Sequence, residues 1–287
     1  MAGQKNILLM EAIKINIEDY VHSGEGANGE SLFHRSDPSV MLKLYNSGAP
    51  TDIIINELEL SRKAFDAGLP VPEPGDLVTD GERLGIRFRR IPGKISFSRS
   101  VGDHPEKVEE YARRFARLCL RLHSIHLDRT KFTSVKDADL KLLEENPYFT
   151  EEEKKKVADF IRSAPDSDVP YHGDLQYSNA VIAEDGSEYF IDLGDFAYGH
   201  PYFDLGMVLL CCVYDDEEFI RETFHMEKPT ALEFWKFFVK EYFGEDADPD
   251  EIEQMLRPYA GLKVLIIERN AGIYFPNFHA LLDSVTK

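Results

Sequence analysis

The sequence predicts an α+β protein with a bilobal architecture, in which a small β-rich lobe with one helix precedes a larger helical lobe. The length of 287 residues suits two domains, or one domain with two lobes. A glycine cluster lies between two possible strands in the first third of the chain, and the apolar periodicity becomes helical after Ile91-Pro92-Gly93. We therefore place the first lobe at residues 1–92 and the second at residues 93–287.

Short strands and turns around a single helix make up the expected first lobe. Residues 15–45 have the composition of strands and turns, with Val40–Tyr45 as a β-rich run, and a hairpin is expected at Leu77–Ile91 with its turn at Asp80-Gly81. From Thr51 the apolar residues recur at helical spacing until Gly68 ends the pattern.

Helical patterns dominate the second lobe. They predict helices from Asp103 to about His126 and at Thr150–Arg162, Thr230–Phe243 and Asp250–Ile273, with one strand at Tyr189–Leu193. Asp103 is the expected N-cap of the first helix, with Glu106 in the capping-box position.

Charge and composition exclude several classes of protein. The chain is 43% hydrophobic, which is too much for general disorder, and its formal charge is −19. Such a surface repels phosphate backbones and anionic lipids, so we expect neither a nucleic-acid partner nor a membrane. Residues 1–92 carry a net charge of −4 and residues 93–287 carry −15, so a cationic partner is favoured on the second lobe.

The three cysteines, Cys119, Cys211 and Cys212, form no CxxC pair and suit buried thiols in a reducing compartment. The N-terminus lacks the pattern of a signal peptide, and no apolar run reaches the length of a membrane span. We therefore expect a cytoplasmic protein.

The glycine cluster has the spacing GxGxxG at Gly24, Gly26 and Gly29. In a dinucleotide fold this loop must open a helix, whereas here the chain continues into another strand. A glycine loop between strands can lie close over phosphates, because no Cβ holds its amides away. An ordinary hairpin loop is the alternative.

Lys43 lies in the middle of the Val40–Tyr45 run and is a candidate phosphate-binding cation, held by a carboxylate of the following helix. Glu57 borders the apolar face of that helix, whereas Glu59 has Arg62 and Lys63 one turn away, an arrangement typical of solvated pairs. We choose Glu57 as the partner. The alternative is an exposed strand lysine.

The strongest signal joins Asp174 and Asn179, five residues apart, with Asp192 at the end of a following strand. One carboxylate can face a hydroxyl group, while the amide oxygen and the second carboxylate are ligands suited to Mg²⁺. A polar loop followed by a strand and a turn would explain either half alone, but it explains the combination at this spacing poorly.

The segments HGDLQYSN, IDLGD and GHPYFDL, which begin at His172, Ile191 and Gly199, resemble those of the aminoglycoside phosphotransferase and choline kinase group of small-molecule kinases. The resemblance runs from the glycine loop to about Leu210. It implies a protein-kinase-like fold and transfer of the γ-phosphate of ATP, or of GTP, to a hydroxyl of a small molecule with the help of Mg²⁺.

The resemblance also assigns roles to residues. It makes Asp174 the catalytic base, Asn179 and Asp192 the magnesium ligands, Lys43 and Glu57 the residues that set the α- and β-phosphates, and Asp204, with His172, a support of the catalytic loop. The nucleotide is expected between the lobes, against Gly24, Gly26, Gly29 and Lys43 and the hinge backbone of Arg89, Arg90 and Ile91.

The chain departs from the family pattern in three places. His200 stands where an aspartate is usual, Asp195 is an additional carboxylate without an assigned role, and the glycine loop lacks a valine two residues after its last glycine. These departures leave phosphotransfer in place and leave open whether the acceptor is an antibiotic or a metabolite.

An acidic run, Asp215, Asp216, Glu217 and Glu218, follows the catalytic segments and predicts a small cationic acceptor such as an amino sugar, an aminoglycoside or a choline-like alcohol. A solvated loop, or a neutral sugar as acceptor, is the alternative.

Other classes of protein fit less well. A protein kinase would need a segment that presents a polypeptide, and none follows Asp192. An inactive nucleotide-binding regulator typically lacks the base or a metal ligand, whereas this chain has Lys43, Asp174, Asn179 and Asp192. A metallohydrolase would need more histidines near the carboxylates, and we interpret His123 and His126 as residues at a helix end near the core.

Overall fold

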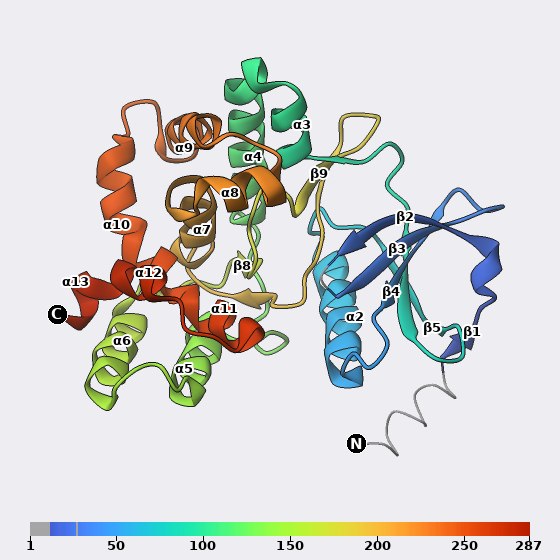
Figure 1. Cartoon of the computed structure of the whole chain (residues 1–287), viewed down its shortest axis with the longest axis horizontal. Coiled ribbons are helices and arrows are strands. Elements are labelled where there is room, and N and C mark those ends of the chain that lie inside the picture. Colours follow the sequence, from blue (N-terminus) through green and yellow to red (C-terminus); the bar gives the residue numbers. More distant parts are fainter. Residues whose placement is uncertain (1–11, 27) are drawn as a thin grey trace. The chain divides into compact units, whose positions relative to one another are not determined.

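The computed structural model describes residues 12–26 and 28–287, and its backbone forms two compact units (Figure 1). The first unit contains the described residues up to Lys94 together with Ile182–Gly194, and the second contains Ile95–Val181 and Asp195–Lys287. The sequence places the boundary at residue 92 and does not anticipate that Ile182–Gly194 returns to the first unit.

A six-stranded sheet with the order β1-β5-β6-β4-β3-β2 forms the first unit. Its strands are β1 (Ile13–Lys14), β2 (Tyr20–Gly26), β3 (Gly29–His34), β4 (Val40–Tyr45), β5 (Pro74–Thr79) and β6 (Leu84–Arg89), with the 3₁₀ turn η1 (Ile17–Asp19) before β2. The strand pairs are antiparallel except for β1 and β5. In this register Lys43 lies between Ser31 of β3 and Ile86 of β6.

Helix α2 (Thr51–Asp66) packs its apolar face on this sheet. Ile54 and Leu58 are buried in one cluster with Ile86 and Phe88 of β6, which is the burial that stabilises an amphipathic helix. The chain leaves the helix through Gly68, whose φ of +81° suits a glycine. Glu57 lies on the same buried side of the helix, with 5% of its surface exposed.

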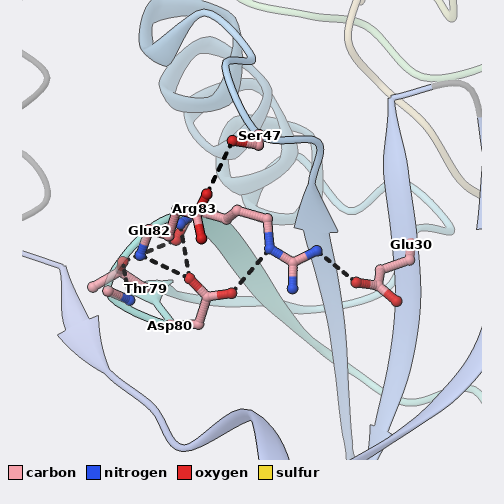
Figure 2. A network of polar contacts seen from close by, with 7 residues as sticks. Glu30, Ser47, Thr79, Asp80, Glu82 and Arg83 are labelled. Atoms are coloured by element: carbon pink, nitrogen blue, oxygen red, sulfur yellow. Dashed lines mark hydrogen bonds and ion pairs between the residues drawn. The ribbon is translucent and has the colours of Figure 1, made fainter.

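The β5–β6 turn lies at Asp80-Gly81, as the sequence predicts, and polar contacts hold it (Figure 2). Thr79 Oγ1 accepts the Gly81 N–H at 2.9 Å, and Asp80 Oδ1 accepts the Arg83 N–H at 2.7 Å. The Arg83 guanidinium then joins Asp80 at 2.9 Å to Glu30 of β3 at 2.7 Å. The turn is thereby tied to the strand that carries the end of the glycine loop.

Helices build the second unit. They are α3 (Phe97–Asp103), η2 (Pro105–Lys107), α4 (Val108–Leu122), α5 (Val135–Glu145), α6 (Glu151–Ser163), α7 (Tyr202–Leu209), η3 (Leu210–Tyr214), α8 (Glu217–Phe219), η4 (Ile220–Phe224), α9 (Lys228–Phe243), α10 (Pro249–Leu262), α11 (Val264–Ala271), α12 (Pro276–His279), η5 (Ala280–Leu282) and α13 (Asp283–Thr286). The short strands of the chain beyond residue 94 are β7 (Ile95–Ser96), β8 (Pro170–Tyr171), β9 (Ala180–Ile182), β10 (Glu188–Phe190) and β11 (Ala197–Tyr198), of which β10 belongs to the first unit. Helices α4 and α9 meet through Phe115, whose ring contacts Phe234 and Phe238.

Two details of the predicted helices are wrong. Asp103 is the last residue of α3 and not an N-cap, and α4 begins at Val108. Pro105 explains the break, because the residue before a proline avoids helical geometry, and His104 has φ −137° and ψ 64°. The helix expected at Asp250–Ile273 is two helices, α10 and α11, that meet at Lys263. The described residues contain no helix that is long and apolar enough to span a membrane.

Candidate active site

Lys43 of β4 makes two ion pairs within the first unit. Its Nζ lies 2.6 Å from Glu57 Oε1 and 2.7 Å from Asp192 Oδ1, and its side chain is 19% exposed. Burial lowers the pKa of Lys43, but the charges of Asp192 and Glu57 outweigh this effect and raise the pKa above its ordinary value. Lys43 is therefore a fixed cation between two carboxylates, and Glu59 has no part in this pair.

Asp192 reaches Lys43 because the chain returns to the first unit after β9. The Ala183 N–H donates to the Ser187 carbonyl at 2.8 Å and closes the turn before β10, and the Phe190 N–H donates to the Pro70 carbonyl at 2.7 Å. Asp192 follows with φ +68°, a left-handed conformation that is uncommon outside glycine. Such strain at a polar side chain is typical of functional positions.

The glycine loop is the tip of the β2–β3 hairpin, as its position between strands predicts. Gly24 and Gly26 belong to β2, Gly29 opens β3, and Gly26 pairs with Gly29. A Cβ on Gly29 would overlap with the Leu44 carbonyl oxygen, so a side chain does not fit there. Ala27 at the tip lies outside the described residues.

The segment predicted as the hinge, Arg89–Ile91, begins at the last residue of β6. The Arg89 N–H donates to the Glu73 carbonyl at 2.8 Å and the Arg90 N–H donates to the Ser39 carbonyl at 2.7 Å, while the Arg90 guanidinium lies 3.8 Å from the centre of the Phe33 ring. A small cavity of the first unit lies here, lined by Phe33, Met41, Pro72, Arg89, Arg90, Ile91, Lys94 and Ile191. Its volume is only about 10 Å³, which is the room that one water-sized group needs.

The 171–179 loop of the second unit carries Asp174 and Asn179. Asp174 Oδ2 accepts hydrogen bonds from Gln176 Nε2 at 2.8 Å and from Asn179 Nδ2 at 2.7 Å. The amide nitrogen of Asn179 is thus engaged, which leaves its carbonyl oxygen as the atom that can bind a cation. Gly173 has φ +94°, and a Cβ there would lie 2.7 Å from Asp195, so the loop requires a glycine at this point.

Asp204 holds this loop through hydrogen bonds to its backbone. It is fully buried, and it accepts the His172 N–H at 2.8 Å and the Gly173 N–H at 3.1 Å. Burial raises the pKa of Asp204, but the hydrogen bond and charge of His123, whose Nε2 lies 3.2 Å away, outweigh burial and hold the pKa below its usual value. The carboxylate is therefore an anion that binds two backbone N–H groups.

Sequence reasoning did not anticipate the roles of two residues, His123 and Lys263, that contact this loop or its partner Asp204. His123 contacts Asp204 and also Tyr242, whose hydroxyl lies 2.8 Å from its Nδ1. Lys263 is buried and donates to the Tyr171 hydroxyl at 2.8 Å. The sequence holds only a weak signal for them, because a histidine at the end of an amphipathic helix and a lone lysine between two helices are common.

The acidic run does not present four equivalent carboxylates. Asp215 is buried, and Asp216 accepts the Phe219 N–H at 2.8 Å as the N-cap of α8, while Glu217 and Glu218 are exposed. Burial raises the pKa of Asp215 to about 7. Asp174, Asp215 and Asp216 line one cavity of about 380 Å³ within the second unit.

His200 and Asp195, which depart from the family pattern, both have contacts within the structure. His200 packs edge-on against Tyr202, with ring centres 4.2 Å apart. Asp195 lies 3.4 Å from the Arg269 guanidinium. In the described residues no group of three or more His, Cys, Asp or Glu side chains is placed to hold a metal ion.

Several aminoglycoside phosphotransferases are among the solved structures that resemble this one. ADP-bound APH(2'')-Ib is 19% identical with a TM-score of 0.57, over 98% of this chain and 97% of that one. The gentamicin complex of APH(2")-IIa is 18% identical with a TM-score of 0.58, over 99% of this chain and 96% of that one. A thermostable APH(4)-Ia mutant with AMP-PNP and hygromycin B is 13% identical with a TM-score of 0.60, over 93% of each chain. At these identities the likeness shows the fold, and it confirms the predicted protein-kinase-like α+β class.

Sequence comparison identifies the family. The model of the phosphotransferase enzyme family matches residues 24–238, which extends from the glycine loop into α9. None of the curated proteins matches the chain. Because the family model covers most of the chain, the predicted membership is confirmed: the chain belongs to the phosphotransferase enzyme family and is a small-molecule kinase.

Proposed function

We propose that this kinase transfers the γ-phosphate of ATP to a hydroxyl group of a small molecule, with Asp174 as the catalytic base. The observation that carries the proposal is the position of Asp174, which lines a cavity large enough for a small acceptor. Its carboxylate lies on a loop that Asp204 holds through two backbone N–H groups. A carboxylate so oriented can position an acceptor hydroxyl and accept its proton during transfer.

The first unit supplies the groups that would bind the nucleotide. Lys43 is a cation beside Glu57 and can bind the α- and β-phosphates. The glycine loop offers backbone amides to phosphates, since Gly24, Gly26 and Gly29 carry no Cβ. By the family resemblance, the base would lie against the backbone of Arg89, Arg90 and Ile91. The same groups suit GTP, so a comparison of the two nucleotides belongs to the test.

Asn179 and Asp192 would hold Mg²⁺. Both offer hard oxygen donors, and the engaged amide nitrogen of Asn179 leaves its oxygen for the metal. When bound, the ion would neutralise charge on the phosphates. The protein's own part is to keep Asp192 in its left-handed conformation against Lys43 and to keep Asn179 bonded to Asp174.

A cationic acceptor fits the charge of the second lobe, which the sequence sets at −15 for residues 93–287. Asp215 and Asp216 line the cavity and can pair with an amine. The gentamicin complex of a similar fold supports a cationic acceptor by analogy.

The test is an ATP-consumption screen over amines, amino sugars, choline-like alcohols and neutral sugars. Asp174→Asn should abolish the acceptor-dependent signal. Asp103→Asn is the matched control, because Asp103 is an exposed aspartate of the same unit at the end of α3. If Asp174→Asn retains full turnover with the best acceptor, Asp174 is not the base. If no hydroxyl compound stimulates ATP consumption, the proposed function fails.

A further inference from the structure

Aromatic rings form much of the wall of the cavity beside Asp174. Phe219 and Phe224 meet edge-on with ring centres 5.6 Å apart. Phe275 and Phe278 are stacked, with ring centres 5.6 Å apart and an angle of 14°. All four belong to the second unit, as do the other lining residues. A volume of about 380 Å³ lies within the range of small-molecule sites.

Aliphatic side chains complete the wall, and the charged groups are few. Met207, Leu210 and Ile267 add apolar surface. Apart from Asp174, the carboxylates at the cavity are Asp215 and Asp216. Asp216 is already engaged as the N-cap of α8. A ligand with several ammonium groups would place some of them against apolar walls, where desolvation without a partner is costly.

The Phe275–Phe278 segment is held in place by a buried carboxylate. Glu268 is 2% exposed, and its Oε1 accepts the Phe275 N–H at 2.9 Å. Glu268 Oε1 also lies 3.0 Å from His279 Nε2, and Glu268 Oε2 accepts a hydrogen bond from Asn146 Nδ2 at 2.8 Å. These hydrogen bonds fix the position of the Phe275–Phe278 segment in the cavity wall.

Part of the aromatic lining of the cavity is open to solvent. Phe219 is 45% exposed, whereas its partner Phe224 is buried at 1%. Contact between Phe219 and an apolar ligand would make binding more favourable, because it removes exposed apolar surface of this side chain from water.

We propose that the acceptor is an amphiphile, with an apolar ring-sized body that carries the reacting hydroxyl and one amine. The aromatic wall binds the body, and Asp215 binds the amine. This inference rests on the proposed function, since it names the class of acceptor for the same site. It separates this chain from an enzyme whose acceptor is a polar polycation.

A matched pair of probes tests the proposal. Ethanolamine and N-benzylethanolamine each carry one amine and one hydroxyl, and the second compound has a benzyl group on the nitrogen. Calorimetric titration of the full chain should show N-benzylethanolamine binding at least about tenfold more tightly, because its ring is buried. Equal affinities would overturn the proposal. Tighter binding of choline or gentamicin than of N-benzylethanolamine would also overturn it, since the wall would then serve cations.

Variants locate the effect. Phe275→Ala should reduce the preference for the benzyl compound to about threefold or less, and Phe278→Ala provides a second test should the first variant unfold. Phe65→Ala is the control, because Phe65 is a 40% exposed phenylalanine on α2 of the first unit, and its preference should equal that of the wild type. A preference that survives in both folded cavity variants contradicts the proposal.

The outcome for the acceptor class is distinguishable from that for the reaction. Tight binding of N-benzylethanolamine without phosphate transfer to any acceptor would support the apolar site and sink the proposed function. Transfer to gentamicin with no benzyl preference in binding would support phosphotransfer and overturn the amphiphile.

Discussion

Replacing Asp204 by asparagine should lower both the stability of the protein and the rate of phosphotransfer. The two carboxylate oxygens of Asp204 accept from three donors, the N–H groups of His172 and Gly173 and the ring of His123. Asparagine offers one oxygen and turns an NH₂ group toward the remaining donors. At least one buried donor therefore loses its acceptor.

The magnitude follows from these contacts. A buried unsatisfied donor costs about 1–3 kcal/mol, and a hydrogen bond to a charged group contributes about 1.5–3 kcal/mol. Together they predict a loss of about 3–5 kcal/mol in the free energy of unfolding, which agrees with the cost of breaking a buried charged pair. Because the two N–H groups precede Asp174, a displacement of the loop by about 1 Å would lower kcat about 100-fold.

Urea unfolding followed by circular dichroism measures the first quantity, and kcat per folded molecule at saturating nucleotide and acceptor measures the second. Asp103→Asn serves again as the control and should leave both quantities unchanged. Wild-type stability in Asp204→Asn would show that the buried contacts contribute little. A large loss of stability with unchanged kcat would show that Asp204 supports the fold without positioning Asp174.

Three further changes have defined outcomes. Glu57→Gln should raise the nucleotide KM and lower kcat, because Lys43 loses one of its two anionic partners. Glu59→Gln, on the exposed side of α2, should match the wild type in the same assay, and equal effects of the two substitutions would contradict the pairing of Lys43 with Glu57. Gly173→Ala should unfold at a lower urea concentration than Gly186→Ala. Both glycines have positive φ, but only at position 173 would a new Cβ overlap with Asp195. Identical urea midpoints for the two variants would refute this overlap. Binding of N-benzylethanolamine should strengthen as the pH rises from 6 to 8, since the Asp215 carboxyl has a pKa of about 7 and must ionise to pair with an amine. Calorimetry of Asp215→Asn should show no such pH dependence, and a dependence that persists in this variant would assign the titration to another group.

The predictions that succeeded concern elements set by local pattern. The glycine cluster became a hairpin tip, Val40–Tyr45 became β4, and the helix from Thr51 follows its apolar stripe. The early helix boundary failed because Pro105 broke a pattern that looked continuous from Asp103. The grouping of Asp174, Asn179 and Asp192, which rests on their spacing along the chain, stays a prediction.

Other features arise only where distant segments meet. The acidic run could be read as four carboxylates, yet whether each one faces solvent, caps a helix or lines a cavity depends on the packing of η3, α8 and η4. His123 reaches Asp204 across 81 positions, and Lys263 reaches Tyr171 across 92. No local periodicity encodes such contacts.

The sequence by itself determined the division into a β-rich first third with one helix and a helical remainder, the family and the candidate residues for chemistry, because these depend on residue type and on spacing along the chain. Only the tertiary structure decided which buried groups hold the 171–179 loop and what walls the cavity beside Asp174. Phe219 and Phe275 are 56 positions apart and line the same cavity only after α8 and the segment before α12 have packed in the second unit. Burial, which raises the pKa of Asp215 and gives the cavity its apolar walls, is a property of that packing.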